Sequence, residues 1–451
     1  MSLARAIANF IVELELENLP PEIVEKGRAC VLNGYGIGLG SHNTPYAPVA
    51  RAAALAMDGE QAAGATLLGD GRKTSVGGAT LANGALFHGR AQEDACGAAH
   101  LGAVVIPLLT ALTEARGISP GRFLPALIAG YEAGGLLELN FSGKTTPVGL
   151  RASTLYGAVA AAAASAKLLG LDAAHTAAAL SNAASFAGGL LQSFADGSDE
   201  WRYQVGMVAR TGLVAAELAR AGSVSAPFAF EGPSGFVKVF TREECDADAL
   251  ASQLGSEWAT LRIAFKPYPV CAFNQTPVNA AIALREQLNG GAIEAVRVRM
   301  NPYETGYAGM DSKGPFHSIS GTLMSIPFCI ANTLAHGVPT MAAMTAYDDV
   351  EVNALIERIN LISDPSVATL CCTIEIDMTD GAHLVQEQNM TFADYSFDRP
   401  QVSALIRRIG DESGVPAAAY DRLEDFAERL PEGDIGQVLE AFSELQYLQA
   451  A

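Results

Sequence analysis

The feature that most constrains the fold is a change in residue periodicity near residue 263. Up to about residue 260, apolar residues recur at helical spacing, and glycines or prolines separate the segments. From Val296 to Met300, apolar and charged residues alternate as they do in a strand. Two further strand-like runs, 368–378 and 382–388, are joined by a turn containing Asp380-Gly381, a pair typical of hairpins. The sequence therefore predicts a mainly α fold with an α+β second domain.

The helical pattern returns after Arg399, over 400–410 and 417–429. We predict a large all-helical domain over 1–262, completed by 398–451, and a smaller α+β lid domain over 263–397 inserted before the C-terminal helices. A chain of 451 residues is too long for one ordinary core, which also favours two domains. Helices are expected in the first domain at 47–57, 78–88, 104–114, 120–136, 153–169, 172–186 and 205–221.

The charge balance and the cysteines limit the partners and the compartment. A formal net charge of −20 disfavours nucleic acid and anionic membrane surfaces as partners, because phosphates would be repelled. The longest small-apolar run, 155–166, is mostly alanine and too short to span a bilayer. The seven cysteines form no C-x-x-C pair, and the N-terminus has no signal-peptide pattern. We therefore expect a soluble, cytoplasmic protein with reduced thiols.

Several familiar nucleotide-binding and catalytic motifs are absent or have the wrong spacing. The glycines of 34–38 have the wrong offset for a dinucleotide loop, and no strand pattern precedes them. Residues 69–74 lack the Walker spacing, and no H-E-x-x-H or G-x-S-x-G sequence is present. Cys96 and His100 are four residues apart, a spacing that could ligate a metal on a helix, but a metal site needs three or four ligands. We expect no bound nucleotide, no metal and no serine-hydrolase triad.

Ordered segments along the chain resemble one family of enzymes. They are Leu81–His88, Glu93-Asp94 followed by His100 and Val104–Pro107, Ala129–Glu132, Ala166–Leu171, Asp196–Ser198 with Arg202 and Gly206, Glu231–Phe236, and Phe265–Cys271. Each segment is weakly specific, but their order and spacing over about residues 5–450 resemble the MmgE/PrpD family.

The resemblance implies a cofactor-independent lyase acting on a small organic carboxylate. Family enzymes include 2-methylcitrate dehydratase, cis-aconitate decarboxylase and iminodisuccinate epimerase. They use neither metal nor organic cofactor, and they share a helical domain, a lid domain with the site in the cleft between them, and usually a homodimer. Their reactions move a proton on a carbon next to a carboxylate, which needs an acid/base group and a clamp for the developing charge.

The resemblance also assigns roles to residues of this chain. His100 matches the family's histidine after the acidic cluster and is expected to be the acid/base group, a task suited to histidine. Lys266 matches the family's active-site lysine, and Asp94 is expected either to take part in catalysis or to orient His100. Arg151 is expected to bind a carboxylate in a bidentate manner. The other predicted substrate-binding residues are Ser153, Trp201, Arg202 and Tyr268.

The chain departs from the family pattern at several of these positions. Ala91 and Ala95 stand where an aspartate and a threonine are usual, Arg151 and Trp201 where a histidine and a lysine are usual, and Gln204 and Gln275 where histidines are usual. Arginine is no base at ordinary pH, so a dehydratase that uses the missing histidine could not work in the same way. Because alanine and tryptophan stand where polar groups are usual, we expect a different substrate, one with a larger apolar part or a ring. An epimerase or isomerase on the same scaffold, or a degenerate member that binds ligand without chemistry, are the alternatives.

Overall fold

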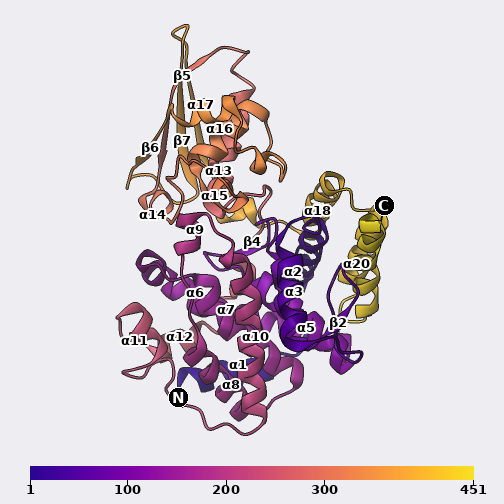
Figure 1. The fold of residues 1–451 in the computed structure, drawn as a ribbon. Coiled ribbons are helices and arrows are strands. Elements are labelled where there is room, and N and C mark those ends of the chain that lie inside the picture. Colours follow the sequence, from indigo (N-terminus) through magenta and orange to yellow (C-terminus); the bar gives the residue numbers. More distant parts are fainter. Residues whose placement is uncertain (451) are drawn as a thin grey trace. The chain divides into compact units, whose positions relative to one another are not determined.

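The chain forms two compact units, shown in the computed structural model of Figure 1, which describes residues 1–450 with side chains through Gln446. The first unit comprises Met1–Gly189, Arg202–Phe265 and the chain from Phe397 onward, and the second comprises Leu190–Trp201 and Lys266–Ser396. The fold class is confirmed: a large helical unit is accompanied by a smaller unit that holds a sheet. The second unit also includes the short segment 190–201, which the sequence pattern assigned to the helical domain.

The first unit is built of helices with two very short strand pairs. Its helices are α1 (Leu3–Glu13), α2 (Pro21–Gly40), α3 (Tyr46–Asp58), α4 (Val76–Phe87), α5 (Leu101–Arg116), α6 (Phe123–Thr145), α7 (Ala152–Leu169), α8 (Ala173–Phe186), α10 (Glu200–Arg220, which starts in the other unit), α11 (Phe236–Thr241), α12 (Ala247–Gln253), α18 (Arg399–Ser413), α19 (Ala417–Arg429) and α20 (Ile435–Ala450). The strand pairs are β1 (Ala65–Thr66) with β2 (Lys73–Thr74), and β3 (Ala95–Cys96) with β4 (Ile263–Ala264). The helices predicted from periodicity are present, and the C-terminal helices pack back on α2 as expected.

Small side chains allow the central helices of this unit to pack closely. Helix α7 is almost entirely buried and lies against α5, α6 and α8. A Cβ atom on Gly134 of α6 would come within 2.7 Å of Ala160 Cβ on α7, so glycine at this position sets the close crossing of the two helices. Alanine and glycine thus act as packing residues, because shorter side chains let the helix backbones approach.

Helix α7 is also long and apolar enough to cross a membrane when judged by length and composition alone. It is longer than the 155–166 run on which the sequence prediction rested, and its mean hydropathy is 1.2. However, 89% of the helix is buried inside the unit, as in the core helix of a folded domain. Burial, rather than length, is what distinguishes this helix from a membrane span.

A second glycine contact brings helices α4 and α10 together. A Cβ atom on Gly206 would lie 2.5 Å from the carbonyl oxygen of Leu81, and one on Gly84 would lie 2.7 Å from Gly206 Cα. The two backbones therefore touch at this point. The crossing places the end of α4, where His88 follows, near the first turns of α10, where Gln204 lies.

The second unit contains a four-stranded sheet in the order β6-β5-β7-β8, with helices packed against it (Figure 1). Its strands are β5 (Ile293–Met300), β6 (Ile359–Ser363), β7 (Cys371–Met378) and β8 (His383–Asn389), and its helices are α9 (Gln192–Asp196), α13 (Gln275–Arg285), α14 (Pro302–Thr305), α15 (Ile319–Met324), α16 (Ile326–His336) and α17 (Val350–Ile356). β7 and β8 form the predicted antiparallel hairpin, with Gly381 at φ +88° in the turn. Strand β6 pairs in parallel with β5 and was not predicted, because the adjacent apolar residues Leu361 and Ile362 break the alternation that indicates a strand.

Candidate active site

The predicted acid/base residue lies at the end of a buried polar loop. The site loop, residues 88–100, connects α4 to α5, and its charged residues Arg90, Glu93 and Asp94 are each no more than 2% exposed. Ala91 takes a left-handed backbone conformation with φ +57°. β3 lies within this loop and pairs antiparallel with β4, so that Ala95 faces Ala264. The pairing holds the loop beside the segment that leads into Phe265.

His100 is held by acceptor oxygens on one side of its ring. Its Nδ1 atom is 2.9 Å from the carbonyl oxygen of Asp94 and 3.4 Å from Glu93 Oε1. Both neighbours are acceptors when the carboxylate is ionised, so Nδ1 carries the hydrogen and Nε2 carries the lone pair of the neutral ring. The backbone N–H of His100 donates to Ser153 Oγ at 3.0 Å. The side chain is 16% exposed, which leaves part of the imidazole accessible.

A second histidine lies behind the first and shares the same carboxylate. His88 is fully buried, its ring centroid is 5.4 Å from that of His100, and its Nδ1 atom is 3.1 Å from Glu93 Oε2. Its Nε2 atom is 2.7 Å from Arg151 Nη2, and Arg151 Nη1 donates to Gln204 Oε1 at 2.8 Å. Arg151 is 1% exposed, so in this structure the predicted carboxylate-binding arginine faces protein groups. The structure thus brings His88, Glu93, His100, Arg151 and Gln204 into one cluster.

The carboxylate of Asp94 points away from this cluster into the helical core. Its Oδ1 atom accepts the N–H of Gly102 in the first turn of α5 at 3.0 Å, and its Oδ2 atom accepts the hydroxyl of Tyr131. A negative charge at a helix N-terminus is favourable because the unpaired N–H groups point at it. Asp94 therefore contacts His100 through its backbone carbonyl, and the contacts of its side chain cap α5. A catalytic role for Asp94 stays a prediction.

A buried lysine also interacts with Asp94. Lys26 lies 4.5 Å from the centroid of the Phe265 ring, a cation–π contact. Burial lowers the pKa of Lys26, and the neighbouring Cys30 and Asp94 oppose that shift. Burial also raises the pKa of Tyr131 well above its usual value, and the Asp94 carboxylate adds to the shift.

Two buried glutamates on α6 fix the backbone of this region. Glu138 accepts the N–H of Ala98 at 2.8 Å, and Glu132 accepts the N–H groups of Ala259 and Thr260 at 3.0 and 2.8 Å. Burial raises the pKa of each glutamate to about 7, while the hydrogen bonds work in the opposite direction. These residues anchor both chain segments that meet in the β3–β4 pair.

The remaining substrate-binding residues predicted near Trp201 are buried in separate surroundings. Arg202 is fully buried with its Cζ atom 3.8 Å from the centroid of the Tyr46 ring in the first unit. Trp201 belongs to the second unit, is 2% exposed, packs against Phe194 with tilted rings whose centroids are 5.1 Å apart, and donates from its indole to Ser320 Oγ at 3.2 Å. These contacts are those of packing residues, and substrate binding by either side chain stays a prediction.

Lys266 is the first residue of the long segment of the second unit and follows β4 by two residues. It is 3% exposed, and its charge works against the burial that raises the pKa of Cys271 to about 11. Gln275 holds the backbone of the following turn: its Nε2 donates to the carbonyls of Tyr268 and Val270 at 3.0 Å, and its Oε1 accepts the Tyr268 N–H at 3.1 Å. The Tyr268 hydroxyl donates to Asn279 Oδ1 at 2.9 Å.

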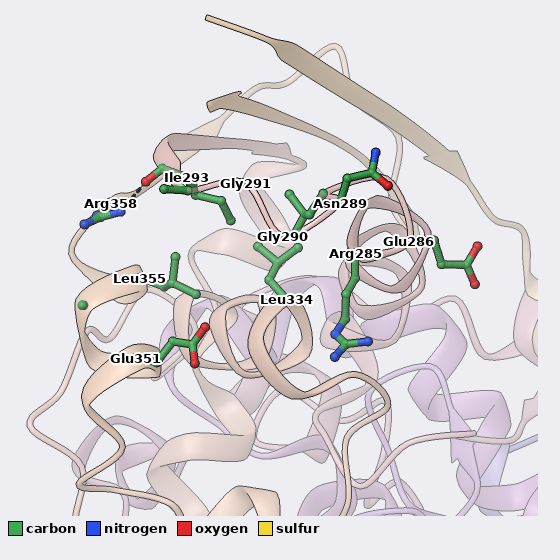
Figure 2. Close-up of a pocket in the computed structure, with 13 residues that line it drawn as sticks. Arg285, Glu286, Asn289, Gly290, Gly291, Ile293, Leu334, Glu351, Leu355 and Arg358 are labelled. Carbon is green, nitrogen blue, oxygen red and sulfur yellow. Dashed lines mark hydrogen bonds between the residues drawn. The ribbon is translucent and has the colours of Figure 1, made fainter. Parts of the chain in front are cut away.

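A pocket of about 570 Å³ lies elsewhere in the second unit, between α13, α16, α17 and the start of β5 (Figure 2). Leu334 and Leu355 lie at its centre, with Arg285 and Arg358 on opposite sides of them. Arg285 and Arg358 donate to the backbone carbonyls of Ala335 and Ile293. The predicted site residues are not among those that line it.

No group of three or more metal-ligating side chains is close enough to hold an ion among the residues that the structure describes. Cys96 lies on β3, and His100 precedes α5 across a tight turn in which Cys96 bridges to Ala99. Their spacing suggested that both side chains could lie on one helix. In the structure they do not.

Sequence reasoning underestimated Glu93 and Gln204. Glu93 was part of the recognised acidic pair, but the match to the family pattern favoured its neighbour Asp94. Only the positions of the two imidazoles show that Glu93 is the carboxylate they share. Gln204 replaces one histidine of the family pattern, and its partner Arg151 replaces another. That both positions had changed was the available signal that they are in contact.

The helical unit carries the loop with His88, Glu93 and His100, and the smaller unit holds the four-stranded sheet. The MmgE/PrpD N-terminal domain model matches residues 5–247, and the MmgE/PrpD C-terminal domain model matches residues 268–409. The chain belongs to the MmgE/PrpD family.

The chain is also similar to two named fungal proteins. It is 30% identical over 278 residues to a cis-aconitate decarboxylase-like protein, oryM, of Aspergillus oryzae, an alignment covering 58% of this chain and 57% of the relative. It is 26% identical over 365 residues to a cis-aconitate decarboxylase of Aspergillus terreus, covering 76% of this chain and 74% of the relative. The chain thus spans a little over half of the first relative. Family membership and these similarities support a lyase-type activity at the level of the family.

Proposed function

We propose that the chain is a lyase that acts without metal or organic cofactor on a small organic carboxylate, with His100 as the acid/base group. The observation that carries the proposal is the orientation of His100. Acceptor oxygens of Asp94 and Glu93 lie at Nδ1, and the ring is partly exposed while its neighbour His88 is buried. A carboxylate beside one imidazole nitrogen favours proton uptake at the other, as in other carboxylate–histidine pairs.

The proposed chemistry is proton transfer at a carbon next to the substrate carboxylate. As a base, His100 takes a proton from that carbon, and the charge that develops spreads into the carboxylate. As an acid, it returns a proton to the carbon after carbon dioxide has left. A cation on the carboxylate lowers the barrier in either case, because it stabilises the charge that develops in the transition state. We assign that role to Lys266, and we retain Ser153, Arg202, Trp201 and Tyr268 as candidates for substrate contact.

The names of the relatives indicate which acid to try first. Two of them are called cis-aconitate decarboxylase or a like protein, so cis-aconitate is the first test substrate. Ala91, Ala95 and Arg151 remove or replace polar groups that the family pattern carries. We therefore expect another unsaturated or hydroxylated acid, with a larger apolar part, to be a better substrate than cis-aconitate.

The experiment is an untargeted search for lost mass. The purified protein is incubated with cis-aconitate, with a panel of di- and tricarboxylic acids, and with a metabolite extract. Masses corresponding to loss of water or carbon dioxide are then followed. Lys266→Ala should abolish any such loss, and Lys144→Ala, at an exposed ion pair with Glu243, serves as its control. An acid that calorimetry shows to bind, but that never loses water or carbon dioxide, would contradict the proposed lyase activity. A change in the stereochemistry of that acid would then favour an epimerase, and no change would favour a binding protein.

We also propose a cytoplasmic homodimer, and one helix face supports the self-association. Met207, Val214 and Leu218 of α10 are each more than 40% exposed and recur at helical spacing, which forms an apolar stripe. Val214→Glu should weaken the dimer at least about tenfold, since an unpaired charge would be buried in the contact. Val350→Glu, at a residue 83% exposed on α17, is the matched control. Sedimentation velocity that finds a monomeric wild type, or an intact Val214→Glu dimer, would contradict this interface.

A further inference from the structure

The contact between Arg151 and His88 has a consequence for the protonation of the whole cluster. A guanidinium group has only donors and keeps its charge at ordinary pH. Arg151 Nη2 lies 2.7 Å from His88 Nε2. Since the guanidinium can only donate, His88 Nε2 must be the acceptor of this hydrogen bond. The hydrogen of the neutral His88 ring is therefore on Nδ1, which lies 3.1 Å from Glu93 Oε2, an ion-pair distance at which the N–H is not aligned for a hydrogen bond.

We propose that Arg151 is a positioning residue that locks His88 in its neutral, Nδ1-protonated form and thereby keeps the charge of Glu93 available to His100. This inference rests on the proposed acid/base role of His100, and it deepens that role. It is independent of the prediction that Arg151 grips the substrate. Glu93 becomes the shared carboxylate of two imidazoles, of which only the more exposed one titrates.

Without the arginine, His88 would change its protonation state. A buried histidine 3.1 Å from a carboxylate would take up a proton and form an ion pair. The positive charge would then be on His88, whose ring is 5.4 Å from that of His100, and it would neutralise Glu93. His100 would lose its carboxylate partner and gain a cationic neighbour, so its pKa would fall. With Arg151 present, His88 cannot be protonated at Nε2 while it accepts this hydrogen bond.

The sign of this effect distinguishes positioning from simple electrostatics. Removal of a positive charge raises the pKa of a nearby histidine if nothing else changes. The locked-histidine arrangement predicts the opposite for His100, because the lost charge reappears on His88. Charged or titratable groups of the same region include Asp94, which interacts with Lys26, Cys30 and Tyr131, Cys96, which interacts with Glu132 and Glu138, and Arg90, which pairs with Glu412.

The test uses the full chain without substrate, labelled with ¹⁵N in its histidines. Two-bond ¹H–¹⁵N correlation spectra report the tautomer and the titration of each ring, and His88→Gln assigns the His88 signals. In the wild type, His88 should be the Nδ1–H tautomer and should not titrate between about pH 5 and 9, while His100 does titrate. The opposite tautomer of His88, or its titration in this range, would overturn the proposal without any variant.

Variants of Arg151 provide the second part of the test. In Arg151→Gln, His88 should begin to titrate, and the midpoint of His100 should fall by about one pH unit. Arg151→Lys, which also can only donate, should restore the wild-type tautomer. Arg51→Gln removes another buried arginine, one that donates to the carbonyl of Leu68, and should leave both histidines unchanged. A rise or no change in the His100 midpoint in Arg151→Gln would refute the positioning role. Because no substrate is present, these results do not depend on whether the lyase proposal holds.

Discussion

At the scale of single residues, the site loop separates two neighbouring acids by the direction of their side chains. Glu93 lies between two imidazoles, whereas Asp94 turns into the core and accepts hydrogen bonds from Gly102 and Tyr131. The close fit is visible at Gly102, where a Cβ atom would lie 2.4 Å from Asp94 Oδ2. We infer that Glu93 affects proton transfer and that Asp94 affects mainly stability.

The stability role predicts a specific loss for Asp94→Ala. The substitution leaves the Tyr131 hydroxyl and a helix N–H group buried without this acceptor, which should cost about 2–4 kcal/mol of unfolding free energy. Asp172→Ala removes an exposed N-cap of α8, which accepts two N–H groups at 2.9 Å, and should cost clearly less, because water can replace the lost acceptor. Chemical denaturation measures both variants. Equal losses would show that the buried position of Asp94 adds nothing.

At the scale of elements, the crossing of α4 and α10 determines where the ends of the two helices lie. Gly206 allows the backbones to touch, and His88 follows one helix while Gln204 lies on the other. Arg151, just before α7, reaches both of them. The geometry of the cluster therefore depends on a residue without a side chain.

This dependence predicts opposite effects for two glycine substitutions. Gly206→Ala should destabilise the protein by about 3 kcal/mol or more, because its Cβ would lie 2.5 Å from the carbonyl oxygen of Leu81. Gly143→Ala, in α6 with nothing within 4 Å of its Cβ, should be neutral or stabilise by up to about 1 kcal/mol. Thermal unfolding of the two variants checks this. A Gly206→Ala protein as stable as Gly143→Ala would show that the helices do not touch there.

Periodicity predicted the elements better than it predicted their contacts. The alternation of 296–300 and the Asp380-Gly381 turn correctly indicated β5 and the β7–β8 hairpin. The predicted helix over 120–136 continues to Thr145, because the added turns are stabilised by packing on neighbouring elements that a local pattern does not show. For the site, the order of the motifs indicated His100 and Asp94. Which of the two acids turns its side chain toward His100 depends on the local course of the backbone at residues 93 and 94, which no motif encodes.

At the scale of the whole molecule, buried glutamates make stability depend on pH. Burial raises the pKa of Glu132, Glu138 and Glu304 from 4.5 to about 7. Between these values the folded protein retains protons that the unfolded chain has lost. Stability from these groups is therefore greatest below about pH 4.5 and declines until about pH 7, above which it is constant.

Glu138→Gln should remove one part of this slope. The glutamine amide stays neutral at both pH values. Between pH 5 and pH 7.5 the unfolding free energy of the variant should therefore fall by about 1–3 kcal/mol less than that of the wild type. Glu243→Gln replaces an exposed acid and should leave the slope as it is. Thermal unfolding at a series of pH values provides the comparison. Parallel curves for the wild type and Glu138→Gln would contradict the raised pKa.

The most direct measurement of the central claim is the exchange of a carbon-bound hydrogen of the substrate with deuterated solvent, followed by NMR. For cis-aconitate, or for the acid that the mass search identifies, the wild type should exchange the hydrogen next to the carboxylate or incorporate deuterium into the product. His100→Ala should lose this by about 10²–10⁴-fold. His175→Ala, at an exposed histidine that pairs with Asp172, should retain it. Full exchange in His100→Ala would contradict the claim that His100 transfers the proton.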